Sequence, residues 1–423
     1  MERKSGLIFR AKNSLLWFLI KVYVRGAMIH RVNANALFSI CRKFARSAID
    51  IWALPLVWMD ESAARAKGLL RPSSSSTSFG PNYIGRVQAK ENIFLPDIYY
   101  FAFEKARISA TSSSVILKDE QVVIERAIGP APHICDYAAG HILVHKNMTA
   151  VARLGSAEAV KNGIFLGGNG SSNYYHWMVE LLAKLEFIPK LPEHYRQYPL
   201  IVSEDVVRIP SFKETLDVFA AGHELIVLRK DMSYVVDELV YINSPSNLPF
   251  NLSGNQKFEC KYVTIDSLSI AYLRKIALQA AEKSPQRADY PQKIFLCRKS
   301  GLRNFNQDEI FDYLATRGFT KVFMEDMGFL EQVNIVHHAD FIVGPTGAAW
   351  TNLIFCKSGA KGLCWMAEEF GDFSAYSNIA HIVGVDLQYV AYKAGVYSTG
   401  ELYYQDYHIE LSMIEKGLAS LSS

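Results

Sequence analysis

Short apolar segments alternate with helical segments along the second half of the chain, and this alternation constrains the fold more than any other feature. The strand-like segments are Lys293–Arg298, Lys321–Met324, Phe341–Val343, Gly362–Trp365 and Leu387–Val390. Helical patterns separate them, beginning at Asn306, Phe329, Gly347 and Ala375. Such alternation predicts right-handed crossovers and a parallel, Rossmann-like sheet. Because ligands bind beyond the carboxyl ends of parallel strands, we expect Arg298, Met324 and Gly344 to border one site.

The first half also mixes both kinds of segment, so we expect an α/β fold throughout. Its strand-like runs are His141–His145, Gly163–Leu166, Leu200–Val202 and Glu224–Leu228, and a long helix is expected to begin near Asn173. Turn-forming runs at Arg71–Ser78, which is too polar and Ser-rich to pack, and near Asn243 predict boundaries. We therefore expect four regions: a basic helical N-terminal segment (1–71), an α/β domain (72–250), a Rossmann-like domain (251–395) and a C-terminal tail helix (396–423).

Charge is distributed unevenly along the 423 residues. The net charge of +3 gives no sign of a nucleic-acid binder, but residues 1–71 carry 13 Lys/Arg and 4 Asp/Glu, so this segment is +9 and the remainder is −6. No run approaches the roughly 20 apolar residues of a membrane span. The basic, Trp-containing stretch 1–60 fits either peripheral contact with a membrane or a helical cap on the first domain.

The six cysteines are scattered and form no Cys-x-x-Cys pair. We expect reduced core thiols and hence a reducing compartment, the cytoplasm, with the inner face of the cell membrane as the surface that the basic segment would touch. No spacing of His, Cys and carboxylates supports a metal site, and none is expected.

The segment Gly344–Asn352 follows a predicted strand and opens a predicted helix. Small residues let a ligand approach the backbone, and the free N–H groups of a first helical turn favour a diphosphate. The candidate phosphate-binding residues are Gly344, Thr346, Gly347, Ala348 and Asn352. A tight turn with small residues for packing explains the same pattern equally well.

Basic side chains follow the first strand of the second half. Arg298 and Arg303 would emerge at the ligand-bearing edge, where a guanidinium suits phosphate oxygens, whereas Lys299 fits a solvated surface at least as well. Met324 and Glu325 lie at the end of the next strand and are candidates for contact with the nucleoside.

The segment Gly167–Glu180 is rich in glycine but matches neither the dinucleotide fingerprint nor the P-loop. In the helix that it opens, Asn173, His176 and Glu180 share one polar stripe, because residues four apart are neighbours. We therefore predict an acid/base pair of His176 and Glu180, with Asn173 beside it. A capped helix with a merely exposed histidine is the alternative.

Together these segments resemble glycosyltransferase family 61 over roughly residues 163–392. The matching pieces are Tyr174–Trp177, Phe295–Arg303, Asn306–Glu309, Phe329–Val333, Gly344–Phe355 and Ser377–His381. The resemblance implies a GT-B-like pair of Rossmann-like domains that face a central cleft. It also implies an inverting, usually UDP-dependent enzyme without a cofactor, which holds the nucleotide-sugar donor in the C-terminal half and a glycan or lipid-linked glycan acceptor in the N-terminal half.

One departure from the family concerns Thr346, where members often have His; a hydrogen bond survives there but an imidazole does not. This variant fits bacterial-type members, which make capsular or other surface polysaccharides.

The expected chemistry is a single displacement at the anomeric carbon. His176 is the first candidate for the base and Glu180 the second. Arg298, Arg303 and the helix opening at Gly347 would neutralise the leaving diphosphate without a metal, and closure of the domains would exclude water. Two alternatives stay open: a nucleotide- or glycan-binding subunit without catalysis, and an NAD-dependent nucleotide-sugar dehydrogenase or epimerase. The missing dinucleotide fingerprint counts against the second alternative.

Overall fold

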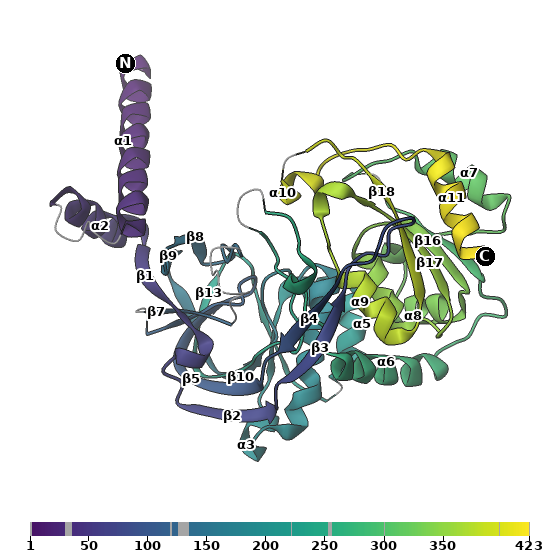
Figure 1. Ribbon diagram of the computed structural model, residues 1–423. Helices are drawn as coiled ribbons and strands as arrows, with labels where there is room; N and C mark the ends of the chain where they lie inside the picture. Colours follow the sequence, from purple (N-terminus) through teal and green to yellow (C-terminus); the bar gives the residue numbers. More distant parts are fainter. Residues whose placement is uncertain are drawn as a thin grey trace.

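The chain folds into two α/β bodies that lie side by side (Figure 1), and the prediction of an α/β fold is confirmed. Helices α1 (Glu2–Met28) and α2 (Ala36–Ile49) stand out from the first body. No helix of the described part of the chain is both long and apolar enough to cross a membrane. The computed structural model describes residues 2–29, 36–118, 121–125, 135–220, 222–252, 256–299, 301–396 and 398–422.

The C-terminal body is built on a five-stranded sheet in the order β15-β14-β16-β17-β18, and every pairing in it is parallel. The strands predicted between residues 293 and 390 are all present, and so is the parallel sheet. Strand order reverses between β14 and β16, which is where ligands bind on open parallel sheets. The strands are β14 (Lys293–Leu296), β15 (Thr320–Val322), β16 (Phe341–Pro345), β17 (Lys361–Ala367) and β18 (Asp386–Tyr392).

Helices cover this sheet, as the alternating pattern predicts. Helix α8 ends at the two histidines His337 and His338. The helices are α6 (Ser267–Glu282), α7 (Gln307–Ala315), α8 (Phe329–His338), α9 (Ala375–Val383) and the 3₁₀ helix η7 (Ala348–Phe355). The tail adds α10 (Thr399–Leu402) and α11 (Leu411–Ser422).

The N-terminal body contains a mixed, eleven-stranded sheet in the order β12-β11-β10-β13-β5-β6-β7-β1-β9-β8, with β2 paired to β5. Only the β12-β11-β10-β13 portion and the β1–β7 pair are parallel. The N-terminal half therefore does not form a second regular Rossmann-like sheet. Its strands are β1 (Ile51–Trp58), β2 (Ala66–Arg71), β5 (Ile98–Ser109), β6 (Val115–Leu117), β7 (Gln121–Ile124), β8 (Ile142–Lys146), β9 (Thr149–Arg153), β10 (Ala157–Phe165), β11 (Leu200–Ser203), β12 (Leu225–Leu228) and β13 (Ser233–Ile242).

In the described part of the segment 1–71, the α-helices end at Ile49; strands β1 and β2 follow with one short 3₁₀ turn between them, so the prediction of a helical segment up to residue 71 is wrong. Strand β1 inserts between β7 and β9, and it buries Ile51, Leu54 and Leu56 there. These pairings join residues far apart in sequence, which the local pattern does not reveal.

The polar run Arg71–Ser78 was expected to be an unpacked linker, and this expectation is wrong. Strand β3 (Ser74–Phe79) pairs with β4 (Lys90–Leu95) to form an arm that lies against the C-terminal body (Figure 1). The fully buried Ser78 hydroxyl donates to Cys260 O at 2.8 Å and accepts from Asn378 Nδ2 at 2.9 Å. Phe79 stacks on His381, with ring centroids 3.7 Å apart. Serines pack here because their hydroxyls find partners.

One hydrophobic cluster runs through both bodies. It contains Trp177 and Val240 from the N-terminal body together with Val343 and Trp365 from the C-terminal sheet. Helices α4 (Glu204–Arg208) and α5 (Pro210–Phe219) lie near this junction, and α5 contacts α8. The two bodies are thus joined by shared apolar packing as well as by the β3–β4 arm.

Asn306 precedes α7 but does not cap it. The Asn306 side chain makes no capping bond to the helix; it donates to Ile409 O at 2.9 Å and accepts from Ile409 N at 3.0 Å. It also donates to Glu309 Oε2 at 2.6 Å. Asn306 therefore holds the tail against the C-terminal body.

Candidate active site

The segment Ser172–Glu180 reaches two cavities. Ser172 and Tyr174 line a cavity of about 360 Å³ between the two bodies, which we name the cleft cavity. Glu180 lines a second cavity of about 80 Å³ within the N-terminal body, the inner cavity. The segment follows β10, so it occupies the carboxyl edge of the parallel strands of that body. His176 lies on the stretch of chain that joins the two cavities.

His176 and Glu180 form the predicted pair. His176 Nδ1 lies 2.8 Å from Glu180 Oε2, and Glu180 Oε1 accepts a hydrogen bond from Leu248 N at 2.5 Å. With its Nδ1 proton on the carboxylate, the imidazole presents Nε2 as an acceptor. No described residue bonds this nitrogen. The pair can therefore take up a proton at Nε2, with the carboxylate orienting the ring.

The backbone that carries this pair is not the predicted long α-helix. His176–Leu181 is a π-helical turn (η3), and Leu182–Lys190 continues it as a 3₁₀ helix (η4). Such turns occur often at functional sites. Gly170 lies against the histidine, since a Cβ there would meet the His176 ring at 2.7 Å.

Asn173 accepts hydrogen bonds from the backbone of this turn. Its carbonyl accepts from Trp177 N, and its Oδ1 accepts from Tyr175 N at 2.9 Å. The side chain thus holds the entry to the turn. Asn173 is next to both Ser172 and Tyr174, the residues that line the cleft cavity.

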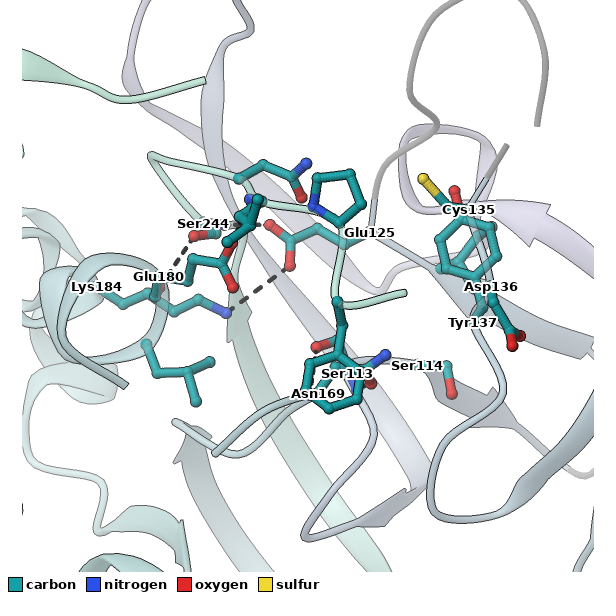
Figure 2. Close-up of a pocket in the computed structure, with 16 residues that line it drawn as sticks. Ser113, Ser114, Glu125, Cys135, Asp136, Tyr137, Asn169, Glu180, Lys184 and Ser244 are labelled. Carbon is teal, nitrogen blue, oxygen red and sulfur yellow. Dashed lines mark hydrogen bonds and ion pairs between the residues drawn. The ribbon is translucent and has the colours of Figure 1, made fainter. Parts of the chain in front are cut away.

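The inner cavity contains a buried cluster of charged residues that the sequence did not reveal (Figure 2). Lys184 is only 1% exposed, and its Nζ lies 3.9 Å from Glu125 Oε2 and 4.5 Å from the centre of the Tyr241 ring. Glu125 also accepts from Tyr241 OH at 2.9 Å and from Ser244 N. In Figure 2 Glu180 and Lys184 come from one helical segment, and Glu125 faces them. A lysine inside the apolar run Leu181–Ile188 is the signal that could have indicated this cluster.

Arg298 lies at the carboxyl end of β14, at the reversal of strand order. Its Nη2 donates to Thr346 O, which follows β16. A Cβ on Gly347 would stand 2.6 Å from the same nitrogen, so any side chain at this position would have to displace the guanidinium. Burial, with repulsion from Arg303 second, lowers the pKa of Arg298 to about 10. The side chain as a whole is half-buried and remains positive at neutral pH.

Tyrosines from the end of the chain surround the two arginines. The Arg303 guanidinium lies 5.6 Å from the centre of the Tyr403 ring, and its backbone has a φ of 55°. Burial raises the pKa of Tyr376 and of Tyr392, while the two arginines act to lower both values. These phenols stay protonated and can donate hydrogen bonds. They come from α9, from β18 and from the tail, so the sequence around Arg303 could not indicate them.

The predicted phosphate segment divides into two groups. A Cβ on Gly344 would meet the Leu296 side chain at 2.7 Å, so this glycine permits close packing of β16 on β14. Thr346 and Gly347 lie beside Arg298, and η7 opens at Ala348, where a helix was predicted. Asn352 is 1% exposed and bonded within the protein. Gly344 and Asn352 are thus packing residues in the protein interior. Thr346, Gly347 and Ala348 lie at the strand end.

A hydrogen-bonded chain crosses between the bodies at the cleft cavity. Tyr174 OH donates to Asn352 Oδ1 at 2.9 Å, and Asn352 Nδ2 donates to Gln332 Oε1 at 3.0 Å. Gln332 Nε2 donates to Met324 O at 2.9 Å. Met324 and Glu325, both predicted, line this cavity. Gln332 was missed, although an amide on the apolar face of α8 is a detectable signal.

Within the described ranges, no group of three or more His, Cys, Asp and Glu side chains is arranged to hold a metal ion.

Comparison with known proteins gives one family. None of the curated proteins that were compared matches the chain. The model of the family Glycosyltransferase 61 matches residues 174–363. This span includes His176, Glu180, Arg298 and Gly347, and it contains every predicted site residue except Asn173. Residues 174–363 of the chain therefore match glycosyltransferase family 61.

Proposed function

We propose that the chain is an inverting glycosyltransferase of polysaccharide biosynthesis, which moves a sugar from a UDP-linked donor to a glycan or lipid-linked glycan. The observation that carries this proposal is the position of Ser172–Glu180, which lines the cleft cavity at one end and the inner cavity at the other. A base on this segment would stand between two substrates. The family match supports glycosyl transfer in general.

The donor would bind at the carboxyl edge of the C-terminal sheet. Arg298 and Arg303 supply positive charge beside Gly347, where the diphosphate would lie. The cleft cavity would take the nucleoside, with Met324 and Glu325 in its wall. A carboxylate such as Glu325 accepts hydrogen bonds from ribose hydroxyls.

The acceptor would approach from the N-terminal body, with one hydroxyl-bearing group in the inner cavity. The Glu125 and Glu180 carboxylates line that cavity together with the hydroxyls of Ser113 and Ser114. Such groups accept from and donate to sugar hydroxyls. The volume of about 80 Å³ suits one polar arm of a sugar and not a whole ring.

The reaction would be a single displacement. His176 Nε2 takes the proton of the acceptor hydroxyl while the acceptor oxygen forms its bond to the anomeric carbon. The bond from that carbon to the diphosphate oxygen breaks, and its electron pair leaves with the nucleoside diphosphate. Arg298 and Arg303 stabilise the charge that develops on the leaving group. Glu180 keeps the imidazole in place and stabilises the imidazolium.

A panel of nucleotide sugars tests this proposal. We expect the wild-type protein to bind UDP-sugars by calorimetry and to release UDP when a glycan acceptor is added. Binding of a nucleotide sugar that is neither transferred nor slowly hydrolysed would instead indicate a subunit without catalysis. Binding of NAD, detected by cofactor fluorescence, in place of any nucleotide sugar would contradict the proposal.

We propose the cytoplasm as the compartment. All six cysteines are buried free thiols, which supports a reducing environment. Fractionation of cells that express the full chain tests this assignment, and recovery in an oxidising compartment would contradict it.

A further inference from the structure

Helices α1 and α2 form a hairpin that projects from the N-terminal body (Figure 1). Its base is firmly packed. Tyr23 is 1% exposed, stacks on Phe38 with ring centroids 5.8 Å apart, and accepts from Ala53 N at 2.6 Å. Cys41 belongs to the same buried cluster, which also includes Val151 of β9. The hairpin is thus attached to the large sheet and is not a loose tail.

The outer side of this hairpin is apolar and exposed. Trp17 and Phe18 are 63% and 56% exposed. Ile40 on α2 is 62% exposed, on the side away from the buried Cys41 and Phe38. Six of the 18 exposed large apolar side chains in the described residues lie within residues 15–40: Leu15, Trp17, Phe18, Ile29, Leu37 and Ile40. Water-soluble surfaces seldom concentrate such side chains without a partner.

The same hairpin is strongly basic. Residues 1–49 contain ten Lys/Arg and a single acidic residue, Glu2. Lys21 and Arg25 follow the apolar run Leu15–Ile20 on α1, and both are exposed. Arg42 and Lys43 are exposed on α2. Exposed apolar and basic side chains therefore occur together on two adjoining helices.

We propose that this hairpin docks on an anionic phospholipid surface. Trp17 and Phe18 would enter the boundary between headgroups and acyl chains, where aromatic side chains are favoured. The flanking bases would meet lipid phosphates, each of them adding to the attraction. The apolar run of six residues is far shorter than the roughly 20 that a span needs, so it lies in the surface.

Charge selects the lipid surface over a second copy of this chain. Two hairpins that meet face to face would bring two segments of the same strong positive charge together, which opposes association. An anionic bilayer supplies the opposite charge and an apolar layer in one structure. This proposal goes beyond glycosyl transfer and holds whether or not the chain has that activity.

Vesicle co-sedimentation of the full chain tests the proposal. The probes are vesicles of phosphatidylcholine alone and of phosphatidylcholine mixed with phosphatidylglycerol. We expect binding to the anionic vesicles only, with weakening as salt increases. The double variant Trp17→Asp/Phe18→Asp should lose affinity about tenfold or more, and Lys21→Glu/Arg25→Glu should do the same.

A matched control is Val87→Asp/Tyr404→Asp, because these side chains are 99% and 73% exposed away from the hairpin. It should bind vesicles like the wild type. Urea unfolding should be unchanged in all three double variants, since the altered side chains are exposed. Absence of vesicle binding, or equal loss in the control, would overturn the proposal. The proposal would also be overturned if light scattering showed the wild type to be a dimer and Trp17→Asp/Phe18→Asp to be a monomer. The exposed apolar side chains of the hairpin would then be covered by a second copy of the chain.

Discussion

The two sheets of this protein differ in how they pair their strands and in what they bring to the site. In the C-terminal sheet every neighbour is parallel and connected through helices, and its edge presents Arg298 beside Gly347. The N-terminal sheet combines parallel and antiparallel pairs, and its parallel portion presents His176 and Glu180. One sheet offers fixed positive charge, and the other offers a group that can accept a proton. In the proposed reaction, donor binding and proton transfer would therefore fall to separate bodies.

Changing His176 is expected to have the largest effect. His176→Ala should lower kcat by about 10²–10⁴-fold, because the acceptor hydroxyl would lose its base. The dissociation constant for UDP should stay within about twofold, since the diphosphate is expected to contact the other body. Steady-state kinetics and calorimetry measure the two quantities on the same preparation.

Glu180→Gln and His338→Ala complete this test. The glutamine keeps the shape of the side chain but not its charge, so kcat should fall less than in His176→Ala. His338 bonds Asn334 O within its own helix at 2.8 Å, and its replacement should leave kcat near the wild-type value. Near-normal turnover in both His176→Ala and Glu180→Gln would refute the assigned base.

Arg298 provides the reverse test. Arg298→Gln should weaken UDP binding about 10- to 100-fold, because charge-assisted hydrogen bonds to the diphosphate are lost. Lys299→Ala is the matched control, since Lys299 is exposed and pairs with Asp326. An unchanged UDP affinity in Arg298→Gln would show that the diphosphate binds elsewhere.

The same arginine predicts a pH dependence. Arg298 is charged below its pKa, which burial lowers to about 10. Affinity for UDP should therefore fall as pH rises through about 10, and this fall should be smaller in Arg298→Gln. Calorimetry at several pH values between about 7 and about 10.5 compares the UDP affinities of the two proteins. An identical pH profile in both would show that Arg298 does not carry the effect.

The difference between the sheets also explains which parts could be predicted from the sequence. Parallel strands separated by helices leave a local pattern, so each strand from Lys293 to Val390 was predicted, and the same pattern placed Arg298 and Gly347 at the edge of this sheet. Antiparallel pairs such as β1 with β9 depend on distant partners, and β1 was missed. Glu125 and Lys184 meet only because β7 and η4 are brought together by that sheet. His176 was identified because its partner is four residues away.

The β3–β4 arm was missed for a related reason, and it links the two bodies. Ser78→Ala should reduce the free energy of unfolding by about 1–2 kcal/mol, because Asn378 Nδ2 would lose its buried acceptor. Urea unfolding measures this change. Ser75→Ala, an exposed position on the same strand, should stay within about 0.5 kcal/mol of the wild type. Equal stability of the two variants would show that the Ser78 hydroxyl does not hold the arm.

The smallest expected effect comes from Gly347, and it tests whether the C-terminal edge depends on the exact position of one guanidinium. The backbone there is extended, with a φ of 170°, so alanine introduces no strain of its own. Its Cβ would stand 2.6 Å from Arg298 Nη2 and must push the guanidinium aside. Gly347→Ala should therefore weaken UDP binding by up to about tenfold, less than removal of the charge in Arg298→Gln. Gly400→Ala is the control, because its Cβ would have no neighbour closer than 4.0 Å. If Gly347→Ala bound UDP as tightly as Gly400→Ala does, the diphosphate would not lie against this nitrogen, even if the arginine itself proved essential.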